Sequence, residues 1–174
     1  MTYFDTEFAA TKYLTDHGLF TMDPQRVSSV LRDLIASIAA LPRAITAEGV
    51  DGAPPWFATE WSLWVLGESL NKLVKRRKGE PLSPIIGVVS DTVRDRRFGK
   101  GRQTFVRILG GVDAEAHKEL LMDLLDDPEV SGHAIKALRV GKVSGASERV
   151  REALRVARVG WIRTEAKKYL AKYP

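Results

Sequence analysis

Two stretches late in the chain decide its fold: VSGHAIKAL at residues 130–138 and IRTEAKKYL at residues 162–170. When the first is laid over the second with a shift of 32 residues, apolar side chains coincide at three positions spaced four apart. These positions are Val130, Ala134 and Leu138 in the first stretch and Ile162, Ala166 and Leu170 in the second. Residues four apart share a helix face, so each stretch predicts a helix with one apolar face.

Each stretch also follows another predicted helix and a tight turn, so the repeating unit is a helix, a turn and a second helix. Such a pair needs a neighbouring pair to cover its apolar face. The unit resembles a HEAT repeat, whose second helix begins after an aspartate-proline-like turn and reads apolar-Arg, then Ala, then Leu. Ile162-Arg163, Ala166 and Leu170 match this pattern, while the first copy has the Asp127-Pro128 turn. Two departures are Ser131 in place of the arginine and Arg158-Val159-Gly160 in place of the aspartate-proline turn.

The resemblance covers about residues 113–172 and implies an all-α fold in which antiparallel helix pairs stack as a short right-handed α-solenoid. Asp23-Pro24, Val27, Leu31 and Ile35 have a related spacing, so residues 1–80 could hold degenerate repeats that pack on the array or continue it. An ordinary helical bundle with one accidental spacing match is the alternative. We expect a single all-helical domain over residues 1–174.

The same periodicity predicts helices over most of the remaining chain. The expected helices cover residues 6–16, 24–41, 56–78, 84–93, 103–109, 113–125, 129–140, 147–158 and 161–172. Residues 43–55, rich in glycine and proline, predict a loop, and residues 94–102 predict a turn. We expect Asp23 to cap the second helix, Gly18 to end the first, and Gly110-Gly111 to stop the helix over 103–109.

Composition excludes several classes of function. The chain has no cysteine, so disulfides, thiolate metal sites and cysteine nucleophiles are ruled out. His17, His117 and His133 never pair at ligand spacing, so we expect neither a metal site nor a cofactor. No export signal or membrane-length apolar run is visible, so we expect a cytoplasmic protein that does not enter the membrane.

Enzyme motifs are missing from the sequence, including phosphate-binding loops, nucleophile elbows and zinc-hydrolase helices. Trp56 with Glu60, and Trp64 with Glu68, do place an aromatic ring and a carboxylate four residues apart. A HEAT-like DNA glycosylase family uses tryptophans and a carboxylate in a concave groove, but glutamate stands here where that family has aspartate. Tryptophans on apolar helices usually belong to the core, so we predict no catalytic residue and favour a protein that is not an enzyme.

Positive charge is concentrated in the predicted repeats. Residues 131–174 hold eleven Lys and Arg against three Asp and Glu, a balance of +8, whereas the whole chain carries +5. Arg151, Arg155 and Arg158 are spaced to share one helix face, and Arg163 and Lys167 form a further pair. Such a face could bind phosphates or acidic side chains, or it could be a solvated face partly neutralised by nearby glutamates.

Two functions remain open. We expect a non-enzymatic interaction or scaffold module that binds a protein partner. The alternative is a nucleic-acid-binding protein of the HEAT-like class, conceivably in DNA repair, that uses Arg151, Arg155, Arg158, Arg163 and Lys167 on phosphates with residues 94–102 assisting. The oligomeric state cannot be predicted from the sequence.

Overall fold

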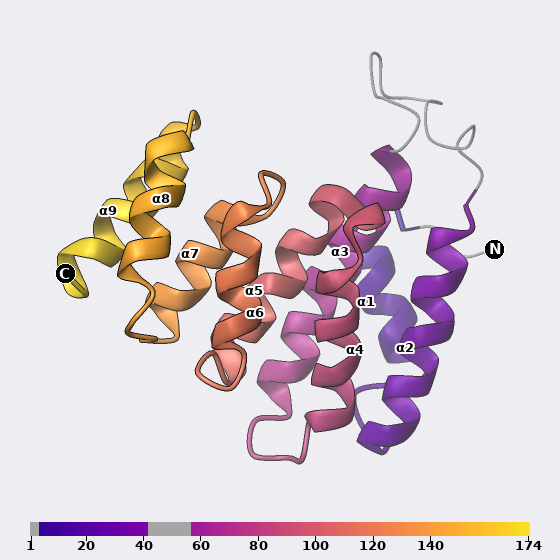
Figure 1. Cartoon of the computed structure of the whole chain (residues 1–174). Coiled ribbons are helices and arrows are strands. Elements are labelled where there is room, and N and C mark those ends of the chain that lie inside the picture. Colours follow the sequence, from indigo (N-terminus) through magenta and orange to yellow (C-terminus); the bar gives the residue numbers. More distant parts are fainter. Residues whose placement is uncertain (1–3, 42–56) are drawn as a thin grey trace. The chain divides into compact units, whose positions relative to one another are not determined.

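The computed structural model describes residues 4–41 and 57–174, and these residues form helices and turns without a strand (Figure 1). The all-α prediction is therefore confirmed for this part of the chain. The predicted loop at 43–55 and Trp56 lie outside the described residues. The chain divides into two compact units, Met1–Phe105 and Val106–Pro174. No helix in the described ranges is both long and apolar enough to cross a membrane.

The described residues of the first unit form four α-helices and one 3-10 helix, followed by the start of α5 (Gln103–Val112). These are α1 (Glu7–Asp16), α2 (Pro24–Ala39), α3 (Phe57–Arg76), α4 (Ser83–Arg94) and η2 (Arg96–Arg102). Helix α3 packs against α1, α2 and η2, while α2 also packs against α4. The described core of this unit consists mainly of leucine, valine and isoleucine side chains such as Leu31, Leu66, Leu70 and Ile85, all with no exposed surface.

Local sequence sets several of the helix ends in this unit. The Thr6 side chain accepts a hydrogen bond from the Ala9 amide at 3.2 Å and caps α1. Asp23 caps α2 in the predicted way, because its carboxylate accepts from the Gln25 amide at 2.9 Å. Gly18 follows α1 with a φ of 70°, the left-handed conformation expected of it.

The second unit begins within α5 (Gln103–Val112) and continues through α6 (Lys118–Asp123), η3 (Leu124–Asp126), α7 (Ser131–Val140), α8 (Ser147–Val156) and α9 (Gly160–Lys172). Helix α7 packs against α6, η3 and α9, and α8 lies beside α9 (Figure 1). A buried Tyr169 hydroxyl on α9 joins it to the turn before α8. That hydroxyl donates to the Val143 carbonyl at 2.9 Å and accepts from the Ala146 amide at 3.2 Å.

The six apolar positions that define the repeat are buried to different degrees at α7 and α9. Val130, Ala134 and Leu138 are buried, and so is Ala166. Ile162 and Leu170 are only half-buried. The first copy is therefore covered by neighbouring helices more completely than the second.

The prediction that Gly110-Gly111 stops a helix is wrong, because α5 continues to Val112. A Cβ atom on Gly110 would lie 2.6 Å from both the Cα and the Cβ of Ala137 on α7. Glycine is needed at this position for the close approach of two backbones. Nothing lies within 4 Å of the corresponding position on Gly111.

Several other predicted helix bounds differ by one or two residues, and the helix expected from Asp113 differs by five. The helix expected from Asp113 starts only at Lys118, since Asp113 instead caps a turn by accepting from the Ala116 amide at 3.2 Å. Helix α8 ends at Val156 rather than at residue 158, because Ala157 adopts an extended conformation with a ψ of 117°. Because α8 ends at Val156, Arg158 does not share a helix face with Arg151 and Arg155.

Candidate functional site

A groove of about 510 Å³ opens in the second unit where the chain passes from α8 into α9. Its walls come from the end of η3, the start of α7, the last turn of α8 and the first turn of α9. The lining residues are Leu125, Asp126, Pro128, Ser131, Glu152, Ala153, Val156, Ala157, Arg158, Val159 and Ile162. Most of these side chains are apolar, so the groove can take an apolar group of a ligand.

Three large apolar side chains stand exposed at the α8–α9 connection. Val156 is 77% exposed, Val159 is 49% exposed and Trp161 is 43% exposed. The cause is local, because Ala157 and Val159 are both extended and carry the chain away from α8 before α9 begins. Apolar side chains grouped on a surface in this way are typical of interaction sites.

Trp161 is held against the start of α7. Its ring meets the His133 ring edge-to-face with the centroids 5.0 Å apart. A Cβ atom on Gly132 would lie 2.4 Å from the indole, so glycine at that position makes room for the tryptophan. Burial lowers the pKa of His133 to about 4, with further contributions from the charges of Arg107 and Lys136. His133 is therefore neutral at physiological pH.

The acidic side chains on the groove wall are already engaged. Arg149 lies 2.7 Å from the carboxylate of Asp126 and 3.5 Å from that of Glu152. Arg158 also lines the groove, and Arg155 and Arg163 are exposed on the adjoining turns of α8 and α9. None of these three arginines makes an ion pair with another described residue.

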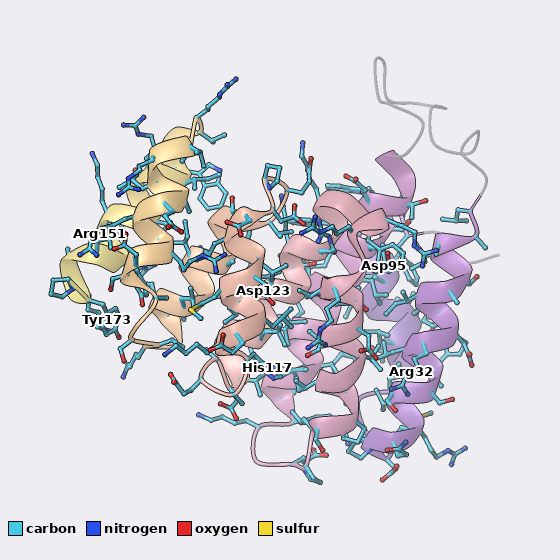
Figure 2. All side chains as sticks on the ribbon, in the orientation of Figure 1. Arg32, Asp95, His117, Asp123, Arg151 and Tyr173 are labelled. Carbon is cyan, nitrogen blue, oxygen red and sulfur yellow. The ribbon has the colours of Figure 1, made fainter. Side chains whose placement is uncertain are left out.

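The predicted basic stripe is divided in the structure. Arg151 and Arg155 share a face of α8, and Arg151 pairs with Glu148 at 3.3 Å; Figure 2 shows Arg151 on the surface of this helix. Arg158 leaves the stripe because it lies beyond the end of α8, and it lines the groove instead. Arg163 and Lys167 lie four residues apart on α9 and are both exposed.

No protein-family model, curated protein or solved structure matches this chain. The HEAT-like resemblance therefore stays a prediction made from the residues quoted above.

One of the glutamates near the basic residues belongs to the packing of the unit and not to its open surface. Glu165 is 8% exposed and lies 2.8 Å from Arg139 on α7 and 3.0 Å from Lys168 on α9. Burial raises the pKa of this carboxyl, but hydrogen bonds from Lys168 and Arg139 and the attraction of both cations outweigh burial. Its pKa is consequently below the usual value, and the ionised carboxylate joins α7 to α9.

Of the predicted aromatic and carboxylate candidates, Glu60, Trp64 and Glu68 lie in the first unit, on α3, and Trp56 lies outside the described residues. A Cβ atom on Gly99 would fall 1.7 Å from the Glu60 carboxylate oxygen, so this side chain packs directly against η2. The Trp64 ring stacks on Trp61 with centroids 5.4 Å apart. The Trp61 indole in turn donates to the Asp5 carbonyl at 2.7 Å. Glu68 is half-buried on the same helix. These contacts give Glu60, Trp61 and Trp64 roles in packing.

Across residues 4–41 and 57–174, no group of three or more His, Asp or Glu side chains is placed to hold a metal ion. The groove was not predicted from the sequence, because it depends on where α8 ends. The valines interspersed among arginines in residues 155–159 were its only visible signal.

Proposed function

We propose that the second unit is a HEAT-like interaction module whose groove binds a segment of a protein partner. The observation that carries the proposal is the exposed group of Val156, Val159 and Trp161 beside a groove of about 510 Å³. This volume lies within the range of roughly 300–1,000 Å³ that is common for binding pockets. Arg158 lines this groove and Trp161 lies beside it on the first turn of α9; tryptophan and arginine are among the side chains most enriched at the energetic centres of protein interfaces.

The HEAT-like part of the proposal is supported by the order of the contacts. Helix α7, the second helix of the first predicted pair, packs against α9, the second helix of the next pair. Helix α8 contacts η3, which ends the first helix of the earlier pair. This is the order expected when neighbouring helix pairs of a solenoid stack on one another.

Nucleic-acid binding is the second candidate, supported by four exposed cations without an ion pair among the described residues: Arg155, Arg158, Arg163 and Lys167. Phosphates are bound mainly by cationic side chains and amide groups. Nucleic-acid binding therefore does not explain the exposed valines at the groove. The apolar lining therefore favours a polypeptide segment.

Site-specific photo-crosslinking tests the proposal. A benzophenone amino acid would replace Val156, and a control protein would carry it at Val140. Both valines are the last residue of a ten-residue helix and both are exposed, at 77% and 53%. Val140 lies nine residues along α7 from Ser131 on the groove wall, about 14 Å along the helix axis. We expect irradiation in native extract to give one dominant protein adduct at position 156 and not at position 140. Equal labelling at both positions would contradict the proposal.

A further inference from the structure

The charges around the groove indicate the chemistry of the segment that it binds, provided that the proposed function is right. Both wall acids lie against Arg149, so these three side chains together carry a net charge of −1. The remaining guanidinium groups, on Arg155, Arg158 and Arg163, are exposed and have no acidic partner among the described residues. We call these three arginines the rim: Arg158 lines the groove, and Arg155 and Arg163 lie on the adjoining turns of α8 and α9. Their +3 exceeds the −1 of Arg149 and the two wall acids, so the surface around the groove carries a net positive charge.

The interior of the groove is apolar, whereas its rim is charged, so the two favour different groups of a ligand. Val156, Val159 and Ile162 line it together with apolar atoms of Leu125 and Ala153. His133, close by under Trp161, is neutral and contributes no charge at physiological pH. A charged group seated among Val156, Val159 and Ile162 would lose water against apolar side chains, whereas a bulky apolar side chain would bury surface there.

We infer that the groove binds an acidic segment of a protein partner, with one bulky apolar side chain seated among Val156, Val159 and Ile162 and flanking Asp or Glu side chains opposite Arg155, Arg158 and Arg163. Guanidinium groups bind carboxylates through two parallel hydrogen bonds, which adds direction to the charge attraction. Pairing of two copies through their grooves is disfavoured, because residues 131–174 carry +8 and two such segments would repel each other.

Selection from a phage-displayed library of random dodecapeptides tests this inference. The full-length chain serves as bait, and the Val156→Asp variant is used to remove phage that bind elsewhere. A synthetic peptide from the selected pool is then titrated against wild type and two double variants of equal net charge. One variant is Arg155→Glu/Arg158→Glu at the rim. The control is Lys136→Glu/Lys142→Glu, at exposed positions of the same unit outside the groove lining.

We expect the selected peptides to carry an aromatic or large aliphatic residue between Asp or Glu residues. The rim variant should bind about tenfold more weakly or worse, since two attractive contacts become repulsive, while the control keeps wild-type affinity to within about threefold. Far-UV circular dichroism of each variant checks that helicity is unchanged.

The other outcomes separate the inference from the proposed function. Neutral or basic peptides that still require Val156 would overturn the inference and leave the groove as a polypeptide site. A selection without any peptide that depends on Val156 would contradict both. Displacement of the selected peptide by duplex DNA at low salt would also overturn the inference. So would a dimer in light-scattering measurements that the selected peptide dissociates, because a second copy would then occupy the groove.

Discussion

Two adjacent glycines on α5 should respond in opposite ways to the same substitution. Gly110 faces α7 closely enough that an added Cβ would lie 2.6 Å from Ala137 Cα and Cβ. Carbon atoms normally pack at roughly 3.5–4.0 Å, so the α7 backbone would have to withdraw by about 1 Å. Gly111 has open space at the corresponding position.

The magnitude follows from two opposing effects. Overpacking of a buried contact costs roughly 1–3 kcal/mol, and the upper end applies to Gly110→Ala because the clash is with backbone and not with a flexible side chain. Alanine regains about 1 kcal/mol over glycine within a helix. We expect Gly110→Ala to lower the free energy of unfolding by about 2 kcal/mol. Gly111→Ala should raise it by roughly 0.5–1 kcal/mol.

Urea unfolding followed by far-UV circular dichroism and by tryptophan fluorescence measures both changes. The pair is well matched, since the two residues are neighbours on one helix and undergo the same chemical change. If Gly110→Ala proved as stable as wild type, the close contact between α5 and α7 would be refuted. A loss of stability in Gly111→Ala would indicate instead that the glycines end the helix, as the sequence had suggested.

Three further predictions concern polar groups of the second unit. Tyr169→Phe should destabilise the chain by about 1–3 kcal/mol in urea unfolding, because it leaves a buried amide and a buried carbonyl unpaired, whereas Tyr173→Phe should have little effect. The lowered pKa of Glu165 adds stability above about pH 4.5 that is lost as pH falls through the folded-state value; in Glu165→Gln, unfolding measured across pH should lack this acid-dependent loss. NMR titration should give His133 a pKa of about 4 in the folded chain. Because the unfolded chain takes up this proton at about pH 6.5, the free energy of unfolding should decrease as pH falls from about 6.5 to about 4.

Local signals in the sequence predicted the helices well where a single side chain determines the helix end. Asp23 caps α2 and Gly18 ends α1 as expected, because capping depends on residues within one turn. The prediction for Gly110 was wrong for a tertiary reason. Nothing near residue 110 in the sequence indicates that Ala137 will lie against it.

The candidate site was predicted only in part, for the same reason. The exposed cations were visible in the sequence, but their grouping required helix α8 to continue through Arg158. Helix α8 ends at Val156, so Arg158 lies beyond it and lines the groove. The helical periodicity of the sequence does not predict this position. Glu165 lies three residues before Lys168 on the same helix, a spacing that is visible in the sequence, but its second partner, Arg139, comes from a different helix.

The most direct test of the central proposal is the affinity of the crosslinked partner, measured by isothermal titration calorimetry, for two single variants. Val156→Asp puts a charge at the groove, and Val140→Asp puts the same charge at the equivalent helix end away from it. We expect Val156→Asp to weaken binding by about tenfold or more, the loss of roughly 1.4 kcal/mol of apolar contact, and Val140→Asp to leave it unchanged. Equal affinities of the two variants would contradict the assignment of the groove as the partner-binding site.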